Sequence, residues 1–186
     1  MSRSPTAGSA SIGGKQRISL TPQDYNWHLS LSGALLQGEL CLLGAPDASA
    51  LALCTPTGYN GWTYTQKHNA LPLTGQLQYR GRELDLTQAL GGYDFSAGYM
   101  RRETSWCWSS INTLLDGVPF GLNLAAGVNE TGLCENALWF DGQIQHLSPA
   151  QFQFDRYQPQ SRWQVSTLCD ELTLEFTPLF CRQEKV

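Results

Sequence analysis

The sequence has little charge and no excess of positive charge. Only 15% of the 186 residues are charged, and 12 lysines and arginines stand against 16 aspartates and glutamates, which gives a formal net charge of −4. Proteins that bind nucleic acids usually present a basic surface to the phosphates. This composition therefore excludes nucleic acid as an expected partner.

Long apolar runs are also missing. No segment approaches the roughly 18 consecutive apolar residues that a membrane-spanning helix needs, and the N-terminal segment lacks the apolar core of a secretory signal. We therefore expect a soluble, cytoplasmic protein without an integral membrane segment. Residues 1–17, which are rich in Gly and Ser, are predicted to form a flexible tail.

Metal-binding and disulfide patterns are absent as well. The six cysteines are widely spaced without a Cys-x-x-Cys pair, and His28, His68 and His146 have no second ligand at a zinc-like spacing. In a chain of this length, scattered cysteines are typically small buried hydrophobic residues in the reduced state. The sequence predicts neither a metal site nor a cofactor.

What the sequence does contain is a succession of short extended runs separated by Gly, Pro and Asn. Asp-Gly pairs at 116–117 and 141–142, and Arg-Gly at 80–81, predict tight hairpin turns, because both central residues of a type I′ turn have positive φ. Helical periodicity is weak. The predicted class is all-β, either a sandwich or an antiparallel barrel, and a barrel of about eight or more strands can hold a small ligand.

The run at 99–109 carries two tryptophans and two arginines. As a single strand it places Arg102, Trp106 and Trp108 on one face. We expect this face to be buried, since each tryptophan can remove on the order of 200 Å² from water. Arg102 would then either bind a carboxylate or reach water from the strand end. The candidate carboxylates are Asp94, Glu135 and, if the strand bends, Glu103.

Three other strand segments carry candidate polar residues. Glu135 stands before Trp139 and is either a desolvated acid or the first polar residue of a strand, while Asn123 either bonds a bulge or faces a ligand cavity. Tyr64 and Lys67 do not share a face unless a bulge intervenes. A lysine in such a strand is typical of a solvated edge position.

Five short segments of the chain, taken in order, are similar to the sequences of one known family. They run through Trp-x-Tyr-Thr-x-Lys, Asp followed by Gly, Thr-x-Trp-x-Trp, Asn-Leu and Glu-Asn, over roughly residues 56–178. The sequence resembles the bacterial family called domain of unknown function 2804. The matching positions are Trp62, Tyr64, Thr65, Lys67, Asp94, Gly98, Thr104, Trp106, Trp108, Asn123, Leu124, Glu135 and Asn136.

The resemblance implies a lipocalin-like (calycin-like) antiparallel barrel, distantly related to hydroxyneurosporene synthase and tocopherol-cyclase-like proteins, which handle isoprenoids. Members of the family are longer at both ends, so the barrel is expected to be incomplete or joined to part of a second barrel. Residues 18–57 would be the end of an N-terminal β-unit and residues 58–186 the main barrel domain. Unpaired strand edges would then favour a homodimer.

Three functions follow as alternatives. The first is binding of a hydrophobic small molecule, a lipid or isoprenoid, in a β-barrel cavity. The second is an enzyme of the hydratase or cyclase type, in which Asp94 or Glu135 donates a proton to an isoprenoid double bond. The third is a packed structural domain without a ligand. The predicted ligand-binding residues are Tyr64, Lys67, Arg102, Trp106, Trp108, Asn123, Asn136 and Trp139.

Overall fold

The chain folds into three antiparallel β-sheets. The computed structural model describes residues 8–12, 16–44, 50–57, 59–99, 105–127 and 132–182, and within these ranges it contains strands β1 to β15 and no helix. The predicted all-β, antiparallel class is confirmed. None of the sheets in the described residues closes on itself, so the structure is consistent with an incomplete barrel or a sandwich. Within the same ranges, no helix is present that could span a membrane.

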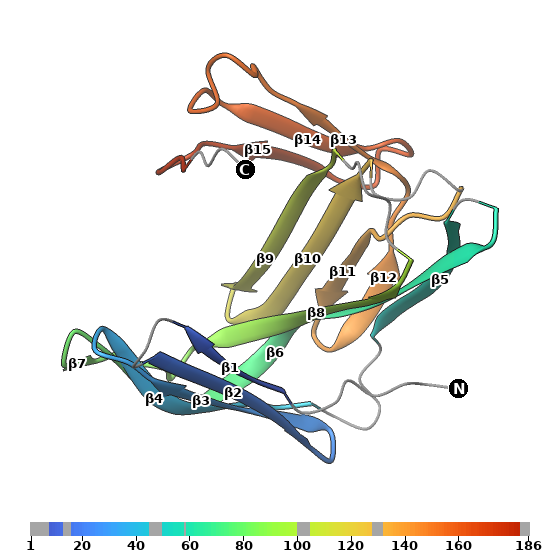
Figure 1. Cartoon of the computed structure of the whole chain (residues 1–186). Coiled ribbons are helices and arrows are strands. Elements are labelled where there is room, and N and C mark those ends of the chain that lie inside the picture. Colours follow the sequence, from blue (N-terminus) through green and yellow to red (C-terminus); the bar gives the residue numbers. More distant parts are fainter. Residues whose placement is uncertain are drawn as a thin grey trace.

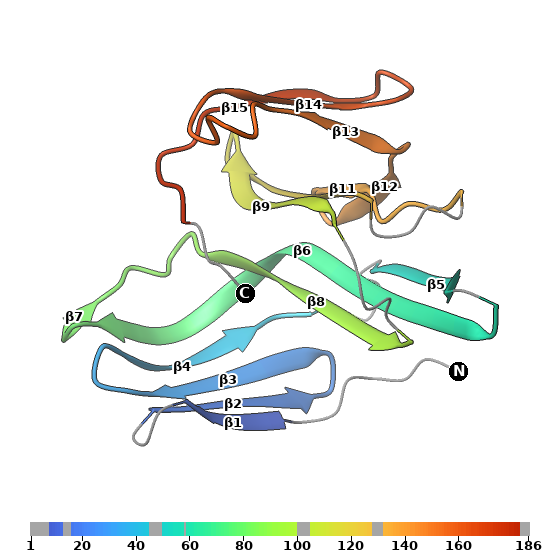
Figure 2. The same cartoon turned by 45° about the horizontal axis from the view of Figure 1, so that its top comes forward.

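The sheets follow one another along the chain and lie in three layers (Figure 1, Figure 2). The first sheet contains β1 (Gly8–Ile12), β2 (Gln16–Gln23), β3 (Asn26–Ser32), β4 (Leu36–Leu42), β5 (Leu51–Thr57), β6 (Gly61–Tyr79), β7 (Arg82–Glu83) and β8 (Leu90–Gly98). The second contains β9 (Cys107–Leu115), β10 (Val118–Ala126), β11 (Ala137–Phe140) and β12 (Gln143–His146). The third contains β13 (Ala150–Gln153), β14 (Trp163–Thr167) and β15 (Thr173–Phe176).

Strand β6 organises the first sheet. Its first half pairs with β5 and β8, and its second half pairs with β4 and β7. Between these halves the register with β8 shifts between His68 and Leu71, and Ala70 takes a φ of 60°. Such a bulge bends a strand and increases its twist. Figure 2 shows the resulting long ribbon of β6, which changes direction near its middle.

The bend of β6 is also where the second sheet packs most closely. A Cβ atom at Gly121 of β10 would lie 2.7 Å from the Cβ of Asn69 and 2.9 Å from its carbonyl carbon, so glycine allows this approach. Leu51, Ala137 and Trp139 form a buried cluster between β5 and β11. A second cluster, of Leu122, Leu124, Leu147, Ala150 and Val165, joins the second sheet to the third.

The predicted hairpin turns are confirmed by the backbone. Asp116 and Gly117 have φ values of 52° and 82°, and Asp141 and Gly142 have 50° and 74°. Positive φ at both central residues matches the right-handed twist of the flanking strands. The Arg-Gly turn at 80–81 has the same form, with φ values of 51° and 74°.

The prediction of one strand over 99–109 with buried tryptophans is wrong. Strand β8 ends at Gly98 and β9 begins at Cys107, so Trp106 lies outside both strands. Trp106 is 55% exposed and Trp108 is 51% exposed. Trp108 lies on β9, an edge strand of the second sheet with a neighbour on one side only, and Trp106 precedes that strand. Arg102 lies outside the described residues.

The cysteines also differ from expectation. All six are free thiols, as predicted, but Cys54 and Cys169 are exposed and the other four are only partly buried. Thin layers with short strands leave few positions that are covered on all sides. Burial raises the pKa of the Cys134 thiol.

Two further predictions concern chain organisation. The proposed boundary after residue 57 falls between β5 and β6, which pair with each other in one sheet. Among the described strands, β1, β5, β7, β8, β9, β12, β13 and β15 each pair with one other strand. The domain division and the homodimer stay predictions.

Candidate functional site

An apolar groove crosses the first sheet. It has a volume of about 480 Å³ and is lined by residues of β2, β3, β4, β6 and β8. The lining residues are Leu20, Trp27, Leu29, Leu40, Leu42, Leu73, Gly91, Gly92, Tyr93, Asp94 and Phe95. Most of these side chains are only partly buried, although they lie next to one another. Contiguous apolar surface of this kind marks sites where another apolar group binds.

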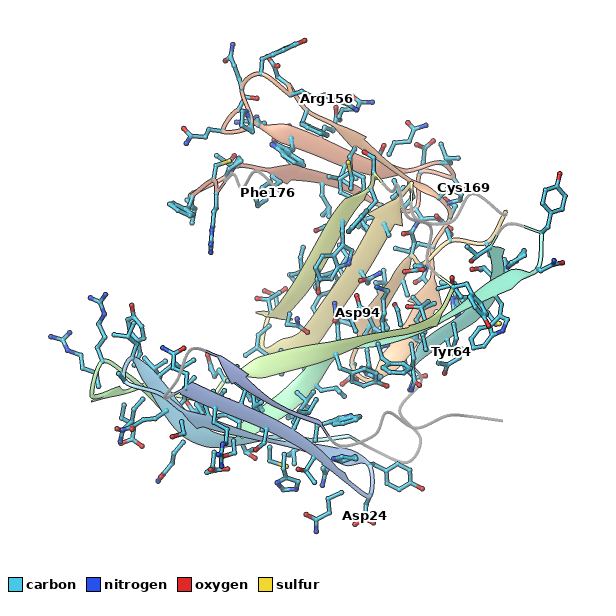
Figure 3. All side chains as sticks on the ribbon, in the orientation of Figure 1. Asp24, Tyr64, Asp94, Arg156, Cys169 and Phe176 are labelled. Carbon is cyan, nitrogen blue, oxygen red and sulfur yellow. The ribbon has the colours of Figure 1, made fainter. Side chains whose placement is uncertain are left out.

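The two faces of β6 and β8 have different chemistry. On one face Tyr64 packs against Phe95, with ring centroids 6.4 Å apart, and Gln66 bonds Tyr93. Asp94 lies between Tyr93 and Phe95 on β8, so its side chain points to the opposite face of the strand. On that face it binds Lys67, its cross-strand neighbour on β6. Figure 3 labels Tyr64 and Asp94 on these neighbouring strands. Strand β8 therefore separates the groove from a polar cluster.

The polar cluster is built around a buried lysine. Lys67 Nζ lies 2.6 Å from Asp94 Oδ2 and 3.3 Å from Glu135 Oε2. The side chains of Lys67 and Glu135 are 7% and 6% exposed, whereas that of Asp94 is 40% exposed. The ammonium group thus joins β6 and β8 of the first sheet to the segment that precedes β11 in the second.

Side chains from the second sheet complete this cluster. Lys67 Nζ lies 5.6 Å from the ring centroid of Trp108, within the range of a cation–π interaction. The indole N–H of Trp108 donates to Asn123 Oδ1 at 2.8 Å, and Asn123 Nδ2 donates to the carbonyl oxygen of Glu135 at 2.5 Å. Five residues singled out in the sequence, from five separate segments, therefore lie together.

Lys67 itself departs from the prediction of a solvated edge residue. Strand β6 has β5 on one side and β8 on the other, and the second sheet covers the face that carries Lys67. The prediction that Tyr64 and Lys67 lie on opposite faces is confirmed by the alternation that places Lys67 with Asp94 and Tyr64 with Phe95.

The remaining predicted ligand-binding residues lie elsewhere. The Asn136 side chain is fully buried, accepts from the backbone N–H of Ala125 at 2.7 Å and donates to the Ser148 carbonyl at 3.0 Å. Trp139 is buried and stacks on His68, with ring centroids 5.4 Å apart. Trp106 is on the surface. Asp94, predicted as a candidate acid, borders the groove on β8, but its carboxylate bonds Lys67 on the other face of the strand. Ligand contact by the other residues stays a prediction.

His68 carries an unusual buried nitrogen. Its Nδ1 donates to the carbonyl oxygen of Asn69 at 2.8 Å, which leaves Nε2 as an acceptor. Nε2 is buried, and no residue in the described ranges bonds to it. Burial lowers the pKa of the imidazole below its ordinary value of 6.5, against the smaller opposite effect of the Asn69 hydrogen bond. The native state therefore holds His68 neutral.

This gives a pH dependence of stability. Since the pKa is lower in the native state than in the unfolded chain, the contribution of His68 is fully present above about pH 6.5 and is lost as the pH falls towards the native pKa. Urea unfolding between about pH 7.5 and pH 5 should show this decline, and His68→Phe, which keeps a ring on Trp139, should reduce its slope. Leu122→Ala is the control, since it lowers stability without changing a titratable group. An unchanged slope in His68→Phe would contradict the assignment.

Other parts of the described chain have fewer features of a binding site. A hollow of about 740 Å³ borders β6, residues 83–90 and Leu114, but its wall is an open loop that includes Glu83, Asp85 and Thr87. Among the described residues, no group of three or more His, Cys, Asp or Glu could hold a metal ion.

Sequence reasoning missed most of the groove. The sequence assigns no role to the groove's leucines, to Trp27 or to Tyr93. The alternation of Trp27 and Leu29 with His28 and Ser30 was a visible signal of an apolar face. Only the fold shows that this face meets the side chains of β8.

Comparison with known proteins gives one result. A family model described as domain of unknown function (DUF2804) matches residues 2–186, nearly the whole chain. Neither a curated protein nor a solved structure matches the chain. The matched range includes all five segments on which the resemblance rested, and residues from each of them lie together in the polar cluster around Lys67. The chain belongs to the DUF2804 family.

Proposed function

We propose that this chain binds a hydrophobic small molecule, a lipid or an isoprenoid, in the groove between β2–β4 and β8. The observation that carries the proposal is the groove itself, which at about 480 Å³ falls in the range of ligand sites and is lined mainly by leucine and aromatic side chains. The lipocalin-like relationship implied by the resemblance is part of the proposal, since lipocalin barrels hold small apolar ligands.

The polar cluster around Lys67 lies on the face of β6 and β8 opposite to the groove. The ion pair of Lys67 with Asp94 and Glu135 fixes β8 against β6 and the second sheet, and so holds the aromatic wall of the groove in place. Tyr64 extends that wall through its contact with Phe95. Among the residues predicted to bind ligand, Tyr64 is thus the one that lies beside a groove residue on the same face.

The alternative of acid catalysis has less support from the geometry. Protonation of an isoprenoid double bond needs a carboxylic acid that can reach the ligand with its proton. Asp94 and Glu135 both lie within ion-pair distance of Lys67, and either would have to give up this contact in order to donate a proton. The arrangement favours a binding protein.

Gly91→Ile tests the proposal. The Cβ of a side chain at Gly91 would lie 2.8 Å from Leu42 Cδ1, and the backbone there accepts an L residue, so isoleucine would occupy the groove after a shift of the Leu42 end. We expect uptake of a fluorescent apolar probe by the wild type and at least about a tenfold loss of affinity in the variant. Gln145→Ile, on an exposed position of β12, is the matched control. Equal uptake by all three proteins would refute binding in the groove.

A further inference from the structure

The side chains of Trp27 and Tyr93 offer hydrogen-bond donors to the groove. Among the described residues that line it, only Trp27, Tyr93 and Asp94 have polar or charged side chains. The Asp94 carboxylate is bonded to Lys67 on the opposite face of β8. The side-chain polar groups left on the groove face are therefore the indole N–H of Trp27 and the hydroxyl of Tyr93, whose rings are 6.4 Å apart between centroids.

The Tyr93 hydroxyl has a hydrogen to donate. A chain of hydrogen bonds runs from Tyr64, whose hydroxyl donates to Gln66 Oε1 at 3.0 Å, to Gln66 Nε2, which donates to the Tyr93 oxygen at 2.9 Å. Tyr93 is the last acceptor in this chain, and none of the described residues accepts its own hydrogen. Burial raises the pKa of Tyr93, so the phenol keeps its proton.

Trp27 adds a second donor. Its indole N–H has no acceptor among the described residues, and an indole nitrogen can only donate. No lysine, arginine or histidine is among the described residues that line the groove. A carboxylate or phosphate buried there would lack a counter-charge, which is costly in an apolar setting. The groove can satisfy a neutral acceptor oxygen without that cost.

We infer that the ligand of this groove is an apolar molecule with a neutral carbonyl oxygen, a ketone, aldehyde or ester, and that the Tyr93 hydroxyl donates to this oxygen. The inference rests on the proposed function and names its ligand class. The apolar body of the ligand lies against the leucines, and the carbonyl lies at the Trp27–Tyr93 contact. Alkanes bind without this hydrogen bond, and fatty-acid anions bind more weakly than the ketone.

The test compares the affinities of three ligands for two proteins. Decane, decan-2-one and decanoate compete with a fluorescent apolar probe on the wild type and on Tyr93→Phe, which removes only the hydroxyl. We expect Tyr93→Phe to weaken the ketone about fivefold and to leave decane unchanged, as for the loss of one neutral hydrogen bond. Comparing the two proteins for each ligand cancels the different solubilities of the ligands in water.

Infrared spectroscopy gives a readout that needs no variant. The carbonyl stretch of decan-2-one bound to the wild type should lie below its frequency in an alkane solvent, because a donor bonds the oxygen. The inference is overturned if the ketone stretch is unshifted, or if decane and ketone respond equally to Tyr93→Phe. In either case the probe still binds and is still blocked by Gly91→Ile, so the proposed function stands. If no apolar ligand binds at all, both the carbonyl inference and the proposed function are wrong.

Discussion

Lys67→Met is expected to lower the free energy of unfolding by about 3–5 kcal/mol, the usual cost of removing one partner from a buried ion pair. Methionine retains the length and the apolar stem of the lysine, so packing changes little. What is lost is the ammonium group that neutralises Glu135, whose side chain is 6% exposed, and Asp94. A buried carboxylate that has lost its contact with Lys67 is then left where the two sheets meet. Urea unfolding followed by tryptophan fluorescence measures the effect.

Two companion variants separate this cause from a general loss of packing. Arg162→Ala breaks the ion pair between Arg162 and Glu175, 3.1 Å long with side chains 66% and 64% exposed, and should cost less than about 1 kcal/mol. Adding Glu135→Gln to Lys67→Met removes the buried carboxylate charge that Lys67 contacts and should restore part of the stability. Additive losses in the double variant would mean that charge is not the reason for the effect.

The same ion pair explains why the polar cluster was only partly predictable. Sequence alternation placed Lys67 and Tyr64 on opposite faces, and the hairpin turns at 116–117 and 141–142 followed from local backbone preferences. Whether Lys67 is buried depends on β8 and on the segment before β11, which are distant in the sequence. Local pattern carries no information on that packing.

Strand β6 shows a second limit of sequence reasoning. The segment around Asn69, Pro72 and Gly75 contains residues that usually interrupt strands, so the sequence favours separate strands on its two sides. The structure instead continues the strand through a bulge with positive φ at Ala70. The bulge is stabilised by partners in the second sheet, which a single-strand pattern cannot reveal.

The tryptophans illustrate the opposite error. A bulky apolar residue in a strand is usually buried, and this expectation fails for Trp108 because β9 is an edge strand. Its ring still has a defined role, since it covers Lys67 and its N–H bonds Asn123. The tryptophan at position 108 thus indicated a residue with specific contacts, but its type did not predict how exposed the side chain is.

Asn69→Ala is expected to cost about 2–3 kcal/mol, because it removes the hydrogen bonds that fix the bend of β6 to the second sheet. Asn69 Nδ2 lies 2.6 Å from the carbonyl oxygen of Leu122, 3.0 Å from Ser110 Oγ and 3.3 Å from the carbonyl oxygen of Ile111. Asn69 and Leu122 are buried, so water cannot replace the lost donor without rearrangement. The free energy of unfolding in urea is again the measurement.

Asn69→Asp distinguishes the hydrogen bonds from the shape of the side chain. Aspartate has nearly the same volume, but it replaces the amide donor with an oxygen that faces the carbonyl oxygens of Leu122 and Ile111. We therefore expect it to destabilise at least as much as alanine. Gln37→Ala, which breaks an exposed 2.8 Å bond to Gln78 within the first sheet, is the control and should change stability by less than about 0.5 kcal/mol. A mild effect of Asn69→Asp would show that packing against Gly121, and not the amide, holds the two sheets together.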